Sequence, residues 1–506
     1  MTILLDGERL TIEQVAAVAR DGESVELTAS ACERVARARE LVERLVAGEA
    51  PVYGLTTGLG HRSTIALAPD ERESFQRRIL LGRAVAIGEP LPAEVVRAAL
   101  VVRASGMAAG GSGVSPAVLA GIVGLLERRV HPIVPADASV GAADLGLLAT
   151  AFLPLIGLGE AELDGVRLPG AAALAAAGLE PLALSGRDGL ALCSSNAVSA
   201  GTAALTVLDA LRLLETACAA GALSLEAFVA NLSPFDERAV RARPGAGQVE
   251  VARRVRSLLA GSRLLEPGVA RRVQDPLSFR CIPQVYGAGL AALERARGAV
   301  ELELAAPADN PLVLADDGEL LSNGNFHTIA LALACEGACL ALAHVGWLAG
   351  QRAIRLLDAR KTDLAESLSP VDGLQIGVAG LGLPLMQLHA ELRHLALPAA
   401  LDSPPIADGI EDHSSHALLA VRKLARVVDR LARIVAIELT VAAQAIELRG
   451  EELRPAALRE LFGRTRESVA FVDEDRPLGG EVERLACRVA AGELEPSDAS
   501  DACSAR

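Results

Sequence analysis

Two long apolar stretches, residues 328–357 and 418–449, constrain the fold of this chain more than any other feature. Both are rich in Ala and Leu and contain no proline. Ala and Leu are the strongest helix formers and proline breaks helices, so each stretch predicts one long helix. The first contains Glu336 and His344. Because a charged group at mid-bilayer costs ~2.5–3.5 kcal/mol, a buried bundle or interface helix is favoured over a membrane span.

The composition extends this prediction to the whole chain. Hydrophobic residues make up 51% and aromatic residues only 2%, while the β-branched and aromatic strand formers are comparatively scarce. We therefore expect a mainly α fold, an elongated helical-bundle subunit with a small N-terminal α/β or helical cap region. A short helix from Thr11 and an amphipathic helix over Ser30–Ala47 belong to this cap. Residues 157–170 are expected to form a hairpin or a loop, residues 308–327 a small hairpin, and residues 360–416 a loop-rich part.

The expected domain organisation has three parts. Residues 1–200 form an N-terminal region that carries the active-site loops. Residues 201–490 form the central long-helix bundle and the C-terminal helices. Residues 491–506 are acidic and polar and are expected to fray.

Charge and cysteine content narrow the class of partner. The net charge of −15 argues against nucleic acid and anionic membranes. Eight cysteines without framework spacing predict free thiols in the cytoplasm, and no signal peptide is recognisable. Cys335 and Cys339 are one helical turn apart, but no neighbouring Cys/His pair completes a metal site, so helix packing is the preferred interpretation. We expect a small-molecule substrate and no metal.

Several short segments carry groups suited to binding or catalysis. Ser139–Ala143 is a small-residue turn before an Ala/Leu-rich segment, and N–H groups at a helix start favour negative charge. Tyr53 lies in a Gly/Thr-rich loop, where a tyrosine either packs or takes part in catalysis. Arg83 stands among apolar residues, where an arginine is ion-paired, extends to solvent or binds an anion. Glu411 is followed by Asp and His, which by themselves indicate only a solvated loop.

In combination, seven segments resemble the histidine and aromatic amino acid ammonia-lyase family. Their order and spacing match over roughly residues 1–490. The segments are Tyr53–Gly60, Gly88–Pro90, Ser139–Ala142, Gln274–Gln284, Asp309–Pro311, Ser322–His327 and Glu411–His413.

The resemblance implies a homotetramer with active sites shared between subunits. Family members remove ammonia from an α-amino acid and leave an α,β-unsaturated acid. They use an electrophile, 4-methylideneimidazole-5-one (MIO), which forms by cyclisation of an internal Ala-Ser-Gly. The amino-acid-like substrate is held by its carboxylate.

The resemblance also implies roles for individual residues. Arg280 corresponds to the arginine that pairs with the substrate carboxylate, a bidentate geometry that suits a guanidinium. Asn310 and Gln274 correspond to its hydrogen-bonding neighbours. Phe326 corresponds to an aromatic wall of the pocket.

The implied catalytic groups are Tyr53, Glu411 and Arg83. Tyr53 corresponds to the loop tyrosine that takes the β-proton. Because a free tyrosine has a pKa near ~10, such a base needs positive charge or a helix end nearby. Glu411 corresponds to a carboxylate that contacts the substrate amine or imidazole, and Arg83 stands where the family has a histidine. Either Ser194 or Asn196 takes the place of a family asparagine.

The sequence departs from the family where the prosthetic group is made. Ala142, Ala143 and Asp144 stand at the MIO position, and no serine is present there to lose water. A literal Ala104-Ser-Gly106 lies within Arg97–Ala109, which we expect to be helical and unable to cyclise. We therefore expect no MIO and no other cofactor.

Three functions remain open on the sequence. The first is a carbon–nitrogen lyase that needs no MIO and expels a good leaving group, such as trimethylamine from a histidine-derived betaine; this resembles ergothionase, a family member without MIO. The second is an MIO-independent addition, elimination or cyclisation on another amino-acid-derived acid. The third is a catalytically inactive paralogue or binding subunit, against which the retained Tyr53, Arg280, Asn310 and Glu411 argue.

Overall fold

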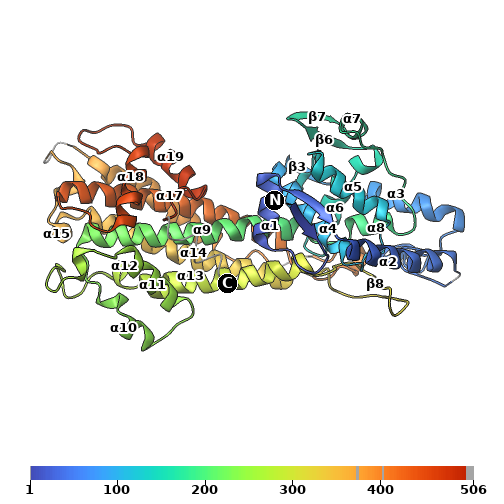
Figure 1. Cartoon of the computed structure of the whole chain (residues 1–506), viewed down its shortest axis with the longest axis horizontal. Coiled ribbons are helices and arrows are strands. Elements are labelled where there is room, and N and C mark those ends of the chain that lie inside the picture. Colours follow the sequence, from blue (N-terminus) through green and yellow to red (C-terminus); the bar gives the residue numbers. More distant parts are fainter. Residues whose placement is uncertain (1, 49, 372–374, 402–403, 497–506) are drawn as a thin grey trace. The chain divides into compact units, whose positions relative to one another are not determined.

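The computed structural model describes residues 2–48, 50–371, 375–401 and 404–496, so the end of the expected frayed tail lies outside the described residues. The chain is 60% helix and 8% strand, which confirms the mainly α fold. It divides into two compact units (Figure 1). Unit 1 comprises the residues up to Val207, Arg297–Leu333 and Ala399–Arg422; unit 2 comprises Leu208–Ala296, Ala334–Pro398 and the residues from Lys423 onward.

Unit 1 contains the small sheets and short helices. Its helices are α1 (Ile12–Ala16), α2 (Ala29–Ala47), α3 (Arg72–Arg83), α4 (Ala93–Ala108), α5 (Pro116–Glu127), α6 (Leu145–Ala151), α7 (Gly170–Ala176) and α8 (Asp188–Cys193). Its strands are β1 (Thr2–Leu5), β2 (Ser24–Leu27), β3 (Ile87–Pro90), β4 (His131–Pro132), β5 (Pro135–Asp137), β6 (Glu160–Leu163), β7 (Val166–Pro169), β8 (Leu312–Leu314) and β9 (Glu319–Leu321). Strands β1 and β2 pair in parallel; β3–β5, β4–β6–β7 and β8–β9 are antiparallel.

The cap region and the hairpins form where the sequence predicts them. Thr11 caps α1 in a capping box: its hydroxyl accepts from the Gln14 N–H, and the Gln14 side chain accepts from the Thr11 N–H. The strands β6–β7 and β8–β9 are the two predicted hairpins. The Ala104-Ser-Gly106 triplet is buried inside α4, where the backbone is helical.

Four long helices have residues in both units, and two of them are the helices that the long apolar stretches predict. They are α9 (Ala197–Phe228), α13 (Ile282–Ala305), α14 (Ile329–Leu356) and α17 (Ala417–Arg449). Unit 2 adds the shorter helices α10 (Glu237–Arg241), α11 (Gln248–Leu258), α12 (Leu277–Arg280), α15 (Ala359–Thr362), α16 (Gly382–Leu395), α18 (Ala456–Ser468) and α19 (Gly479–Ala490).

Helix α16 corrects the expectation that residues 360–416 are mainly loop. Leu385, Leu388, Leu392 and Leu395 recur at helical spacing and are buried, so this segment packs one apolar face on the unit. Glycines and Pro384 near its start hide the pattern in the sequence, although a proline is tolerated in the first turn of a helix.

A buried ionic network joins the four long helices within unit 2. The Arg352 guanidinium (α14) donates from Nε to the Glu438 carboxylate (α17) at 2.6 Å and from Nη2 at 2.9 Å. The Ser224 hydroxyl (α9) donates to the same carboxylate at 2.7 Å, and Arg352 also donates to the Tyr286 hydroxyl (α13). All four side chains are fully buried. Each buried charge is thus paired and hydrogen-bonded, as burial requires.

Two helical segments are long and apolar enough to cross a membrane by length and composition alone. The first is Asp188–Phe228, and 83% of its most apolar 18-residue window is buried inside the structure. The second is Ile329–Leu356, and 50% of the corresponding window is buried. Because Arg352 of the second segment forms a buried ion pair with α17, that helix packs in the bundle as the sequence predicts.

We predict that Glu438→Ala lowers the free energy of unfolding by about 3–5 kcal/mol, because it leaves the Arg352 charge buried without its partner. Chemical denaturation measures this loss. The matched control is Glu266→Ala, which removes an exposed pair with Arg454 and costs less than about 1 kcal/mol. Equal losses for the two variants would show that the buried network does not hold the bundle together.

Candidate active site

A cavity of about 930 Å³ lies within unit 1. It is lined by the loop after Pro51, the last turns of α3, the loop before α6, the end of α8, and two loops around residues 310–327 and 407–413. These segments are far apart in the sequence, and the fold brings predicted site residues from each of them to one place. The predicted residues that line the cavity are Tyr53, Arg83, Ala142, Ala143, Ser194, Asn310, Phe326 and Glu411.

The Tyr53 loop is held by its own backbone and hydroxyl groups. The Gly60 N–H donates to the Tyr53 hydroxyl oxygen at 2.9 Å, which fixes the position of the ring. The chain turns at Gly54, where φ is +71°, a left-handed conformation that favours glycine. The Thr56 hydroxyl accepts from the Val52 N–H at 2.7 Å. The Gly/Thr-rich sequence thus forms a loop that is held by hydrogen bonds within it.

Asp144 anchors the loop that precedes α6. Its carboxylate is fully buried and accepts from the Ser139 hydroxyl at 2.7 Å, the Ser199 hydroxyl at 2.8 Å and the Ser199 N–H at 2.7 Å. The Asp144 N–H donates to the Ser195 carbonyl at 2.7 Å. Burial raises the pKa of Asp144, and these hydrogen bonds oppose that rise. Burial, with a smaller contribution from the Asp144 charge, also raises the pKa of Glu303 on α13 to about 7.

The residues between Ser139 and Asp144 lie against two other segments. The Gly141 carbonyl accepts from the Ser415 hydroxyl at 2.9 Å, and Ala142 forms a β-bridge with His327. The Ala143 N–H donates to the Phe326 carbonyl at 3.3 Å. Ala143 has φ +63°, a conformation that is uncommon for a residue with a side chain. The loop therefore presents Ala142 and Ala143 to the cavity in a fixed, strained turn.

We predict that Gly141→Ala destabilises the fold by about 2–4 kcal/mol, measured by thermal or chemical unfolding. Gly141 has φ +83°, and an added Cβ would lie 2.1 Å from the Ser415 Oγ and 2.8 Å from the His416 N. Gly165→Ala is the control, because Gly165 has φ +77° but open space around it; it should cost about 1 kcal/mol. A Gly141→Ala loss no larger than the control would mean that the loop tolerates displacement.

Ser194 and Asn196, the two candidates for one family position, separate in the structure. Ser194 lines the cavity. Asn196 is not among the lining residues; it donates from Nδ2 to the Phe326 carbonyl at 2.8 Å and so supports the aromatic wall from behind. Asn310 accepts from the Asn323 N–H at 3.0 Å. The preceding residue, Asp309, is fully buried and forms an ion pair with Arg103 at 2.8 Å.

Arg280 and Gln274 lie in a different part of the chain from the cavity. Both belong to unit 2, at α12 and the loop before it, and the Arg280 guanidinium donates to the Gln274 side-chain oxygen at 3.2 Å. Neither is among the residues that line the cavity, all of which belong to unit 1. The structure thus places these two residues next to each other in unit 2, whereas the predicted residues that line the cavity belong to unit 1.

Two histidines on the cavity wall are not among the site residues that the sequence predicts. His327 and His413 share a hydrogen bond, with Nε2 and Nδ1 2.9 Å apart. Both stand at the ends of motifs that resemble the family, Asn-Phe-His and Glu-Asp-His, and these motifs are the only sequence signal that marks them. Arg62 and Arg78 also line the cavity, and no motif marks either one.

The charges on the cavity wall are of both signs. The cationic side chains are Arg62, Arg78 and Arg83, and the anionic side chains are Glu71, Glu411 and Asp412. A wall of this kind can hold a zwitterion, because each end of an amino acid meets an opposite charge. Within the described ranges, no group of three or more His, Cys, Asp or Glu side chains could hold a metal ion.

Comparison with known proteins gives consistent matches over nearly the full chain. The sequence matches the aromatic amino acid lyase family over residues 10–467. It is 42% identical to a histidine ammonia-lyase of Symbiobacterium thermophilum, with 96% of each chain covered. The fold is similar to ergothionase from Treponema denticola, an ergothioneine-degrading enzyme (TM-score 0.94, 30% identity, 98% and 99% covered). It is also similar to histidine ammonia-lyase from Trypanosoma cruzi (TM-score 0.90, 28% identity, 98% and 94% covered).

These matches correct two expectations from the sequence. The relatives of nearly equal length are histidine ammonia-lyases, which eliminate ammonia from histidine. Such enzymes normally use MIO. This contradicts the expected MIO-independent elimination of a better leaving group, and it contradicts the expected absence of any cofactor. The expectations rested on one local difference, the triplet at Ala142–Asp144, whereas the similarity extends over the whole chain.

The residues at the MIO position do not fit the group as the family forms it. The prosthetic group takes its methylidene carbon from a serine, and Ala142, Ala143 and Asp144 do not include one. Asp144 is in addition committed to the buried contacts with Ser139 and Ser199. We therefore assign no catalytic step to MIO and consider only what the other side chains do.

Proposed function

Because the chain belongs to the aromatic amino acid lyase family, we propose that it is a carbon–nitrogen lyase that eliminates ammonia from histidine or a close imidazole-bearing relative. One observation carries the proposal. The full-length similarity to histidine ammonia-lyases coincides with a single cavity that gathers the family's Tyr53, Asn310, Phe326 and Glu411 positions.

The cavity has a group for the proton transfer and groups for the ring and the amine, whereas the carboxylate anchor and the activation of the amine as a leaving group are not assigned to its lining residues. The reaction breaks the Cβ–H and Cα–N bonds and leaves an α,β-unsaturated acid. Tyr53 takes the β-proton, and three arginines line the same wall. Among them is Arg83, at the end of α3. Glu411 contacts the amine or the imidazole, and Phe326 forms the wall against the ring.

We further propose that the site is completed by a second copy of the chain, in a homotetramer. Arg280 and Gln274, which correspond to the family's carboxylate-binding residues, are then supplied by the partner. This accounts for a cavity of unit 1 that lacks them.

Among the described residues, seven cysteines are free, which supports the expected cytoplasmic location.

An apolar patch on unit 2 supports the assembly. Helix α14 exposes Leu340 and Trp347 seven residues apart, with exposed fractions of 52% and 50%. Helix α16 exposes Leu383 and Met386, and the Trp347 ring lies 4.8 Å from the ring of His389 on the same helix. The two helices therefore contact each other at Trp347 and His389, and both expose large apolar side chains. Large apolar side chains exposed on neighbouring helices are typical of an interface.

We predict that the purified protein converts L-histidine to the conjugated unsaturated acid and ammonia. Ultraviolet absorbance follows the acid and a coupled assay follows the ammonia. Tyr53→Phe should lower kcat by about 100-fold or more, because it removes the proton acceptor. The control is Phe462→Leu, a substitution in α18 of unit 2. Faster turnover of trimethylated histidine than of histidine would contradict the proposal, as would an active Tyr53→Phe variant.

We predict that Tyr53→Phe and Arg280→Ala chains, each inactive alone, regain activity when they are co-expressed. If Tyr53 and Arg280 of one site come from different copies, random mixing leaves both intact in about a quarter of the sites. Turnover of the purified mixed oligomer measures the recovery, and each homo-oligomer serves as the control. A mixed oligomer without recovery would show that the two residues do not meet from different copies.

A further inference from the structure

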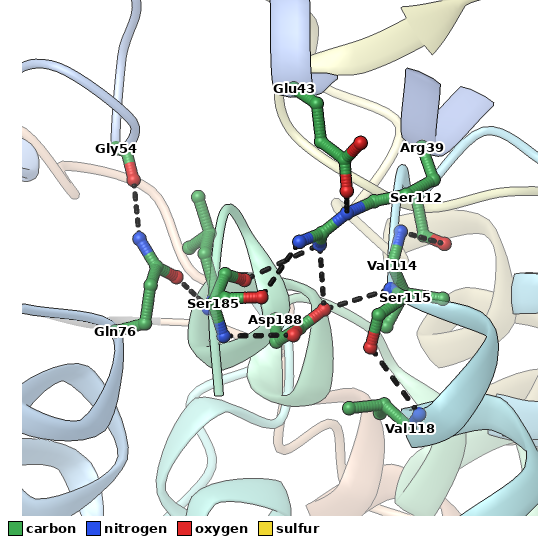
Figure 2. Close-up of polar contacts among 11 residues, drawn as sticks. Arg39, Glu43, Gly54, Gln76, Ser112, Val114, Ser115, Val118, Ser185 and Asp188 are labelled. Atoms are coloured by element: carbon green, nitrogen blue, oxygen red, sulfur yellow. Dashed lines mark hydrogen bonds and ion pairs between the residues drawn. The ribbon is translucent and has the colours of Figure 1, made fainter. Parts of the chain in front are cut away.

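Gln76 is a fully buried amide on α3 that none of the motifs contains. Its side chain lies between two segments of the cavity wall. The Nε2 donates to the Gly54 carbonyl at 3.0 Å, and the Oε1 accepts from the Leu190 N–H of α8 at 3.2 Å. Figure 2 shows the first of these bonds, with the Gln76 amide directed at Gly54. A single side chain therefore connects α3, the Tyr53 loop and α8.

Both partners of Gln76 are backbone groups that need an acceptor or donor from outside their own segment. Leu190 is the third residue of α8, and N–H groups in the first turn of a helix have no acceptor within that helix. Gly54 lies in a left-handed turn, and an added Cβ there would come within 2.8 Å of Leu59 and 2.7 Å of Leu190. Because an unpaired buried polar group is costly, the two hydrogen bonds of Gln76 hold the three segments in their observed arrangement.

The start of α8 is held separately from the Tyr53 loop. Asp188 accepts from the Arg39 guanidinium at 3.1 Å, from the Ser115 N–H at 2.8 Å and from the Ser185 N–H at 3.0 Å (Figure 2). None of these partners belongs to the Tyr53 loop. The backbones of α3 and α8 also approach closely, because a Cβ on Gly189 would lie 2.0 Å from the Gln76 carbonyl oxygen. The hydrogen bonds of Asp188 thus hold α8 in place, and the Gln76 side chain connects α8 to the Tyr53 loop.

We propose that Gln76 is a positioning residue that holds Tyr53 at a fixed position relative to Ser194 and to the cavity-lining residues of α3. Tyr53 immediately precedes Gly54 in the chain, and Ser194 directly follows α8. The proposal rests on the proposed function only in that Tyr53 is the base of the reaction. A displacement of about 1 Å of a reacting group can cost a hundredfold in rate, so the loss of this contact acts on catalysis and not only on stability.

The chain offers a matched control in Gln444 of α17, which is also fully buried. Its Nε2 donates to the Leu368 and Val472 carbonyls at 3.2 and 2.8 Å, and its Oε1 accepts from the Val472 N–H at 3.1 Å. Gln444 lies in unit 2, whereas Tyr53 lies in unit 1. Gln76→Leu and Gln444→Leu therefore remove the same kind of buried bridge, and only the first concerns the Tyr53 loop.

The chain also offers a readout that does not depend on turnover. It contains only two tyrosines, Tyr53 and Tyr286. The NMR spectrum of protein labelled with ¹³C at the phenolic carbon thus contains two signals, which the Tyr53→Phe variant assigns. Tyr286 is fully buried in unit 2 and serves as the internal reference.

The experiment compares the full-length wild type with Gln76→Leu, Gln76→Glu and Gln444→Leu. The glutamate variant retains an acceptor for Leu190 but loses the donor to Gly54, and it also serves if the leucine variant does not fold. We expect both Gln76 variants to shift or broaden the Tyr53 signal and leave that of Tyr286 unchanged. We expect them to lower kcat by about 10-fold to 100-fold with little change in KM. Gln444→Leu should lower the Tm and leave the Tyr53 signal and kcat unchanged.

An unchanged Tyr53 signal in a folded Gln76 variant would overturn the proposal, as would an equal Tyr53 shift in Gln444→Leu. A wild type that does not turn over histidine would refute the proposed function only. The Tyr53 signal would still decide whether Gln76 positions the loop.

Discussion

A buried carboxylate, that of Asp144, is the interaction on which the cavity depends. A charge without hydrogen bonds in a protein interior is too costly to persist, so the Asp144 side chain must keep its serine partners. Those partners lie on both sides of it in the sequence, at Ser139 in the same loop and at Ser199 in α9. The loop that presents Ala142 and Ala143 is therefore fixed by the residue that follows them. The loop keeps a defined, strained shape although the serine of the family triplet is absent from it.

The rest of the site is built in the same way, from short segments each held by one buried polar side chain with partners in another segment. Gln76 joins α3 to the Tyr53 loop and α8, Asn196 supports Phe326, and Arg103 holds Asp309 beside Asn310. Loops carry the reactive groups, and buried polar contacts supply the rigidity that the loops lack. In unit 2 the Arg352–Glu438 network has the corresponding role for the long helices.

Much of the fold was predictable because it follows from local sequence. The long helices, the Thr11 capping box and the two hairpins each follow from propensity, periodicity or turn residues within a few positions. Helix α16 was missed because glycines and a proline at its start suggest a loop, although its leucines keep helical spacing. His327 and His413 each stand in a motif, but the sequence does not predict that they pair, because their hydrogen bond joins segments 86 residues apart. The MIO-independent function predicted from the altered triplet is wrong for a related reason: the triplet is one local difference, whereas the similarity to histidine ammonia-lyases extends along nearly the entire chain.

The order and spacing of its motifs suffice to identify the family of this chain and to nominate Tyr53, Asn310, Phe326 and Glu411, because those residues stand in recognisable local contexts. Spacing along the chain carries no information about distance in space. The folded chain was needed to show that Ser194 faces the cavity while Asn196 turns to Phe326, and that Arg280 and Gln274 pair in unit 2. It was also needed to find Gln76, because a buried amide is recognised by the backbone groups it joins, and these come together only when helices and loops pack.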